Sequence, residues 1–294
     1  MAGNAGNAGN AGNAGNAGNA GNAGNDTSAS SGWFFADRID LPFVTEFSGG
    51  GYIAQQTANP SAFPDQSWSA EWFSWRLLLE FIATNGLASG TDPGTWSSQT
   101  GFTSVSDEIA NLVTAAQDER PDALGEILSQ SGEFVSYYLN LMTATPAAYP
   151  HTNRVLHGAS LIALYVAMEW KAKYMRPRPS QICPALLPPI AVPGHASFPS
   201  GHCTQAHLMA LCMGAVFDGL TAAQQPNTVP MRRDLAALAD RIARNREIAG
   251  LHYPSDSQAG VKIAGSILQL LNGMATNSLY KTAIGDATGE WQWL

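Results

Sequence analysis

The sequence from position 199 to 217 reads PSGHCTQAHLMALCMGAVF. Ser200 stands where a helix N-cap is expected, because a long, mostly apolar stretch of helical character follows it. The serine hydroxyl, the Gly201 amide and the positive end of the helix dipole together favour binding of a tetrahedral anion. His202 lies in the first turn, where an imidazole can exchange a proton near neutral pH. Taken alone, however, Ser-Gly-His is more typical of a capped helix with a surface histidine.

Helical patterns dominate the chain on both sides of this stretch. Apolar residues recur at helical spacing across residues 70–85, and we expect Trp72 and Trp75 of this segment in the core. Ser106 and Asp107 can cap a helix, and Pro121 suits the first turn of the next. No stretch alternates as a strand would, so the predicted fold class is all-α. The expected helices span residues 70–85, 106–119, 152–173, 200–217, 230–249 and 254–274, with another opening at 121.

The N-terminal part of the chain has a different composition. Residues 2–25 repeat Ala-Gly-Asn without interruption, and such a tract has no side chains with which to build a core. A polar connector follows, and Trp33 begins a more aromatic sequence. We therefore expect a low-complexity, disordered segment and linker over residues 1–31, and a single helical catalytic domain over residues 32–294.

Charge and hydropathy exclude several functions. The formal net charge of -8 argues against general attraction to nucleic acid or anionic membranes. The longest mostly apolar segments, residues 159–168 and 208–217, are half of the about 20 residues that a membrane span needs. We expect no membrane span and, with no secretory signal pattern at the N-terminus, a cytoplasmic location. The three cysteines have no metal-ligand spacing.

Two further segments place ionisable residues near helix ends. In the first, Lys171 ends a predicted helix, and the proline after Arg178 favours an extended backbone at that arginine. In the second, Arg246 lies near one helix end and His252 near the start of the next. Asp256 follows one turn later, where its carboxylate can fix the tautomer of His252. Each segment alone is also typical of ordinary helix termini.

The three segments together form one signature. It runs Lys171, six residues, Arg178-Pro179; then Pro199-Ser200-Gly201-His202; then Arg246, five residues, His252, three residues, Asp256. In order and spacing the chain resembles the family that unites vanadium haloperoxidases with type 2 phosphatidic acid phosphatases. The resemblance covers about residues 171–260 and implies a helical bundle of the acid phosphatase and vanadium haloperoxidase type. The one departure is Asn245, where the phosphatase pattern usually has serine.

The resemblance also implies a role for each residue of the signature. His252 attacks phosphorus or binds the vanadium of vanadate, His202 is the acid-base, and Asp256 orients His252. The residues implied to bind the oxyanion, with phosphate or vanadate in the same place, are Lys171, Arg178, Ser200, Gly201, His202 and Arg246.

His195 separates the two activities of the family. A histidine five residues before Ser200 resembles the bromoperoxidases, whereas soluble acid phosphatases usually have a small polar residue there. We therefore expect a vanadate-dependent haloperoxidase that oxidises bromide with hydrogen peroxide. The alternative is a soluble acid phosphatase that hydrolyses phosphate monoesters through a phosphohistidine and needs no cofactor.

A third alternative is an inactive oxyanion-binding or scaffold protein, against which the proton-exchanging pair His202 and His252 argues. In any of these cases the expected partners are small molecules, and a homo-oligomer is compatible with the sequence. The histidines outside the signature, His151, His157 and His207, are expected to be structural because they show no zinc-type spacing.

Overall fold

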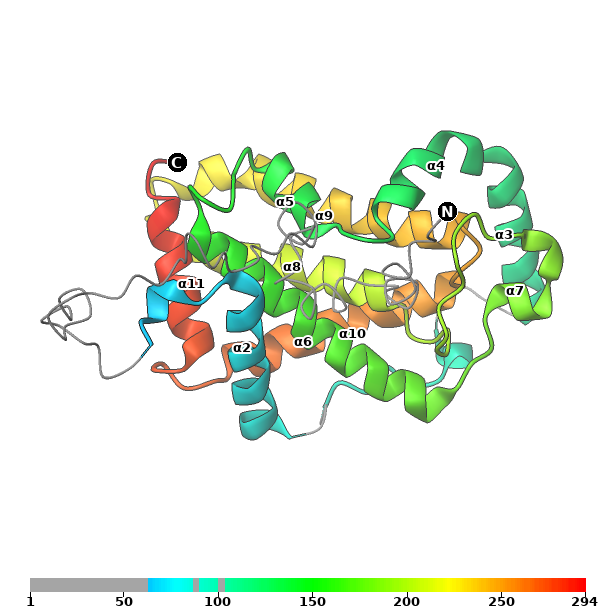
Figure 1. Ribbon diagram of the computed structural model, residues 1–294, viewed down its shortest axis with the longest axis horizontal. Coiled ribbons are helices and arrows are strands. Elements are labelled where there is room, and N and C mark those ends of the chain that lie inside the picture. Colours follow the sequence, from blue (N-terminus) through cyan, green and yellow to red (C-terminus); the bar gives the residue numbers. More distant parts are fainter. Residues whose placement is uncertain (1–62, 87–89, 100–103) are drawn as a thin grey trace, which may run out of the picture.

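The computed structural model describes residues 63–86, 90–99 and 104–294 (Figure 1). The Ala-Gly-Asn repeat, the connector and the predicted boundary at residue 31 lie outside the described residues. Within the described part every regular element is helical, which confirms the all-α class. The α-helices are α2 (Ala70–Asn85), α3 (Val105–Asp118), α4 (Arg120–Ser129), α5 (Val135–Leu141), α6 (Pro150–Tyr174), α7 (Pro179–Ile182), α8 (Gly201–Asp218), α9 (Gln225–Ile248), α10 (Pro254–Asn272) and α11 (Leu279–Glu290).

Helices α6 and α8 form the centre of the bundle. Helix α6 packs against α2 and α8, and α8 also packs against α9 and α10 (Figure 1). Helices α6 and α9 run toward one end of the bundle, and α8 and α10 run away from it (Figure 1). Two helix C-termini and two helix N-termini therefore meet at that end.

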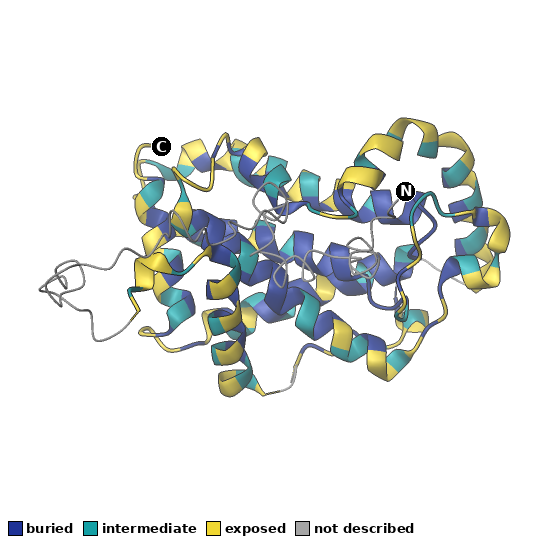
Figure 2. Cartoon of the chain, in the orientation of Figure 1, coloured by how far each residue is buried: buried dark blue, intermediate teal, exposed yellow. Residues whose placement is uncertain are grey.

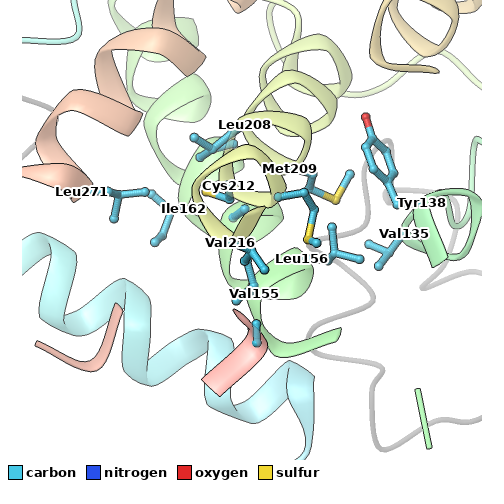
Figure 3. Packing of buried hydrophobic residues seen from close by; sticks show 14 of the residues in the cluster. Val135, Tyr138, Val155, Leu156, Ile162, Leu208, Met209, Cys212, Val216 and Leu271 are labelled. Atoms are coloured by element: carbon cyan, nitrogen blue, oxygen red, sulfur yellow. The ribbon is translucent and has the colours of Figure 1, made fainter. Parts of the chain in front are cut away.

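Buried residues concentrate along these central helices, while the outer faces are exposed (Figure 2). Figure 3 shows Met209, Cys212 and Val216 of α8 packed with Leu156 and Ile162 of α6. All five are at most 1% exposed. Burial of this kind contributes about 25 cal/mol per Å² of apolar surface, and it holds the ends of α6 and α8 in fixed relative positions.

The apolar face predicted for α2 was wrong. Trp72 and Trp75 are 47% and 38% exposed, whereas Phe73, Leu77 and Phe81 are buried against α6. The buried residues recur at every fourth position, so a second apolar stripe on the same helix faces the core. Gly158 of α6 accounts for the burial of this face of α2, because the absence of a side chain at Gly158 leaves room for Leu77.

The other expected helices are confirmed, with shifted ends. Helix α3 begins after Ser104, whose hydroxyl accepts a hydrogen bond from Asp107 N at 3.1 Å, so the cap lies before the predicted Ser106. Helix α9 begins at Gln225 and continues through Pro230. The sequence analysis did not anticipate α5, α7 or α11. No helix in the described part of the chain is long and apolar enough to cross a membrane.

We predict that Gly158→Ala destabilises the protein and that Gly265→Ala does not. A Cβ at Gly158 would lie 2.4 Å from Leu77 Cδ1, and such overpacking costs about 1–3 kcal/mol. A Cβ at Gly265 of α10 would contact nothing within 4 Å, so alanine there stabilises the helix by up to about 1 kcal/mol. Thermal unfolding of both variants measures the difference. Equal melting temperatures would show that α2 does not depend on this close approach.

Candidate active site

The three segments of the signature meet at one end of the bundle. Lys171 lies in the last turn of α6, Ser200 caps α8, Arg246 lies in the last turn of α9, and Asp256 lies in the first turn of α10. Positive ends of two helix dipoles and cationic side chains from two helix C-termini therefore point into one region. Such an arrangement favours an anion.

The N-terminus of α8 has the geometry that the sequence predicts. Ser200 Oγ accepts a hydrogen bond from Cys203 N at 3.4 Å, which leaves the hydroxyl hydrogen free to donate to a ligand. Ser200 N donates to Asp256 O at 3.0 Å and so ties α8 to α10. Gly260 permits this contact, since a Cβ there would lie 2.9 Å from Cys203 Cβ and 3.1 Å from Ser200 O.

Gly250 turns the chain from α9 back toward the site. Its φ of 74° is in the left-handed region, which favours glycine. Gly250 N donates to Glu247 O and Leu251 N donates to Arg246 O, the hydrogen-bond pattern of a Schellman motif. This turn holds His252 in a fixed position relative to Arg246, six residues earlier in the chain.

Lys171 and Arg178 are buried and donate to backbone carbonyls around the site. Lys171 Nζ donates to Ala196 O at 2.9 Å and to Ser197 O at 2.8 Å. Arg178 Nε donates to His195 O at 3.0 Å, and Arg178 Nη1 donates to Leu251 O at 2.9 Å. Gly201 lies beside Lys171, because a Cβ there would be 4.0 Å from Lys171 Cε.

Arg246 has donors without acceptors. Its side chain is fully buried, and Nη2 donates to Ile127 O at 2.9 Å. Nε and Nη1 are also buried but have no hydrogen-bond partner. An unpaired buried donor costs about 1–3 kcal/mol, and more when it is charged, so these two nitrogens favour a bound acceptor.

The three cations have no carboxylate within ion-pairing distance among the residues that the structure describes. Burial lowers the pKa of Arg178 and of Arg246 to about 10, so both guanidinium groups are charged at neutral pH. Burial and then the charge of Arg178 lower the pKa of Lys171. A bound anion would offset both effects, because a nearby opposite charge favours the protonated amine.

His252 is held as a neutral base beside these cations. Its Nδ1 lies 3.1 Å from Asp256 Oδ2, and its Nε2 lies 3.3 Å from Arg178 Nη1. Burial, followed by the charges of Arg178 and Lys171, lowers the pKa of His252. A proton on Nδ1, donated to Asp256, leaves the lone pair of Nε2 directed to the cationic side.

His202 lies on the other side of the site, against the segment that follows α4. Its Nε2 is 3.2 Å from Gln130 O, and its ring stacks on Phe134 with centroids 5.0 Å apart. Burial and then the charge of Arg246 lower the pKa of His202. The neutral imidazole therefore donates Nε2–H to the Gln130 carbonyl when no ligand is bound.

His195 is half-buried, whereas the other predicted site residues are buried. Its Nδ1 lies 3.1 Å from Arg178 Nη2. Burial and then the charges of Lys171 and Arg178 lower the pKa of His195 to about 4, so its imidazole is neutral at pH 7. The structure thus brings all nine predicted site residues together, and their chemical roles stay predictions.

The site is also supported by contacts of Arg176, Glu108 and Asn245 that the sequence did not indicate. Arg176 and Glu108 form a buried ion pair next to Asp256. Asn245 Nδ2 donates to Glu126 and to Gln130 Oε1, each at 2.9 Å, and so holds α4 against α9. Asn245 thereby helps to hold Gln130, whose carbonyl oxygen contacts His202. The Arg-x-Arg-Pro spacing was visible in the sequence, but nothing there paired Arg176 with a partner 68 residues away.

Comparison with known proteins supports a phosphatase relationship. Residues 154–279 match the family model described as the PAP2 superfamily. Over 167 residues the chain is 29% identical to the decaprenylphosphoryl-5-phosphoribose phosphatase of Mycobacterium tuberculosis, in strain CDC 1551 / Oshkosh and in strain H37Rv alike. The alignment covers 54% of this chain and 86% of each relative. These findings favour the phosphatase alternative over the haloperoxidase interpretation of His195.

We predict that Arg246→Met removes anion binding at little cost to the unliganded protein. Replacing a buried charge by an apolar side chain of similar volume is often neutral or stabilising, whereas phosphate bound to the native state raises the melting temperature by mass action. Thermal unfolding with and without phosphate should show a smaller phosphate-induced rise in the variant. Arg233→Met, at a 75% exposed side chain, is the control and should respond as the wild type does. An undiminished rise in Arg246→Met would place the anion elsewhere.

Proposed function

Because residues 154–279 form a PAP2 superfamily domain, we propose that this chain is a phosphatase that hydrolyses phosphate monoesters through a phosphohistidine at His252. The observation that carries the proposal is the buried positive charge of Lys171, Arg178 and Arg246 beside His252, whose Nε2 contacts Arg178. A phosphoryl group carries its negative charge on oxygens around the phosphorus, and stabilising that charge is the main task of such a site.

In the first step the lone pair of His252 Nε2 attacks phosphorus and the ester P–O bond breaks. Asp256 accepts the Nδ1–H of His252 and stabilises the positive charge that the imidazole gains. Arg178 Nη1, which contacts Nε2 at 3.3 Å without a ligand, would donate to a phosphoryl oxygen instead. Ser200 Oγ and the Gly201 amide add donors at the N-terminus of α8.

The departing alkoxide needs a proton, and His202 is the group placed to supply it. Burial lowers the pKa of His202 in the unliganded site, and the charges of Arg246 and Arg178 lower it further. A bound phosphate would offset them and so favour the protonated imidazole. In the second step His202 takes a proton from water, water oxygen attacks phosphorus, the P–N bond breaks, and inorganic phosphate leaves with His252 restored.

A second candidate function is carried by His195 alone. Its imidazole contacts Arg178 and is the most exposed of the predicted site residues, so a small solute can approach it. The unpartnered donors of Arg246 fit vanadate as well as phosphate, and His252 Nε2 is the candidate vanadium ligand. Vanadate, when bound, would supply Lewis-acid activation of hydrogen peroxide for halide oxidation. The comparisons support the phosphatase better, so the haloperoxidase is the lesser proposal.

We predict that the loss of activity in His202→Ala depends on the leaving group. An alkyl phosphate has a basic leaving group and should lose about 10²–10⁴-fold in kcat/KM, whereas 4-nitrophenyl phosphate should lose much less, because nitrophenolate leaves without a proton. Steady-state kinetics on both esters measures the split. The control is His207→Ala on the same helix, whose imidazole faces Asp240 rather than the site. Equal losses on the two esters would remove the acid role from His202.

We predict hydrolysis rather than halide oxidation in a paired assay on one preparation. The vanadate-free protein should hydrolyse 4-nitrophenyl phosphate, vanadate should compete, and His252→Ala should abolish turnover because the nucleophile is lost. Asp256→Ala should weaken turnover less. Bromide oxidation with hydrogen peroxide after vanadate loading is measured beside it. Vanadate-dependent oxidation that His195→Ala depresses, in a protein without esterolysis, would make the haloperoxidase the correct function.

A further inference from the structure

A buried arginine outside the signature contacts the carboxylate that orients His252. Arg176 follows α6 and is 2% exposed. Its Nη1 donates to Asp256 Oδ1 and to Ser255 Oγ, each at 2.7 Å. The centre of its guanidinium lies 3.6 Å from the ring centroid of Tyr253, so the plane of the group is packed as well as hydrogen-bonded.

The opposite side of the guanidinium is held by α3. Arg176 Nη2 donates to Glu108 Oε2 at 2.6 Å, and Glu108 Oε1 accepts from Ser255 N at 2.9 Å. Glu108 therefore contacts both Arg176 and the first turn of α10. It lies before the part of the chain that matches the PAP2 superfamily, so an element outside that match supports the centre of the site.

These contacts divide the two oxygens of Asp256 between different tasks. Oδ1 accepts from Arg176. Oδ2 accepts from His252 Nδ1 and Tyr253 N, each at 3.1 Å, and from Ser197 Oγ. A carboxylate bound on both sides cannot rotate, and its Oδ2 stays aligned with the imidazole.

We infer that Arg176 is a positioning residue: through Asp256, and braced by Glu108, it sets the orientation and tautomer of His252. The inference rests on the proposed function, since it concerns how the nucleophile is held for attack. Arg176 does not reach the predicted phosphate position, because its hydrogen bonds go to Asp256, Ser255 and Glu108. It should therefore affect the chemical step and leave phosphate binding to the other cations.

The test is a double-mutant cycle on hydrolysis of 4-nitrophenyl phosphate. Arg176→Gln should lower kcat about 10–100-fold and change neither KM nor inhibition by inorganic phosphate by more than about threefold. If Arg176 acts through Asp256, the same substitution in an Asp256→Asn background should add almost nothing. Arg176→Lys keeps the charge but not the planar fork, and should recover part of kcat. Losses that multiply in the double variant, or a KM that rises with kcat unchanged, would overturn the inference.

The matched control is Arg154, another buried arginine, which lies on α6. It donates to the carbonyls of residues 65, 66 and 68, far from the signature residues in the chain. Arg154→Gln should lower the melting temperature and leave kcat unchanged. If Arg176→Gln does not fold, Glu108→Gln replaces it, because that variant keeps an acceptor for Ser255 N and leaves Arg176 paired with Asp256. Glu108→Gln should lower kcat less than tenfold, and it should cause no further loss when Asp256→Asn is already present. Losses that add in the double variant would contradict the inference.

A readout without catalysis separates this inference from the proposed function. Nitrogen NMR of ¹⁵N-histidine-labelled protein at one pH should show the His252 proton on Nδ1 in the wild type and a mixture of tautomers in Arg176→Gln. A protein that hydrolyses no phosphate ester but shows this change would disprove the phosphatase and retain the positioning role. Unchanged His252 signals in an active enzyme would disprove the positioning role alone.

Discussion

Lys171, Arg178 and Arg246 are buried together without a carboxylate to pair with, and the rest of the structure follows from that charge. Burying a cation is costly unless it is paired and hydrogen-bonded. The chain meets the cost partly with backbone carbonyls, which accept from each of the three side chains. Carbonyl dipoles neutralise no net charge, so the site keeps an excess of positive charge. A bound oxyanion can offset that excess. Burial lowers the pKa of each neighbouring histidine, and the same unbalanced charge lowers it further.

The helix directions make this concentration of charge possible. Helices α6 and α9 carry their cations in their last turns, while α8 and α10 begin at the same place with the positive ends of their dipoles toward the site. Gly250 and Gly260 are required because the connections are short and the helices approach closely. The apolar core of α6 and α8, distant from the chemistry, fixes these ends relative to each other.

Local sequence patterns predicted the ends of the central helices. The features that they did not predict depend on contacts between residues far apart in the chain. The ends of α6, α8 and α10 lie within two residues of the predicted ones, because capping residues and prolines are read from neighbouring positions. The buried face of α2 could not be chosen from its own sequence, since Phe73 and Leu77 compete with Trp72 and Trp75 and only Gly158 decides between them. Glu108 was missed for the same reason: its partner Arg176 is 68 residues away.

If phosphate and vanadate bind to the same three cations, these residues alone do not separate hydrolysis from halide oxidation. Charge neutralisation by Lys171, Arg178 and Arg246 serves any tetrahedral or trigonal-bipyramidal oxyanion equally. Phosphate-ester hydrolysis and halide oxidation differ in how protons are transferred. Proton transfer depends on the histidines next to the three cations. His202 is hydrogen-bonded to Gln130 and stacked on Phe134, both outside the matched domain. His195 is bound to Arg178 at the exposed edge. We therefore expect the contacts of His202 and His195, rather than the three cations, to decide which of the two reactions the site favours.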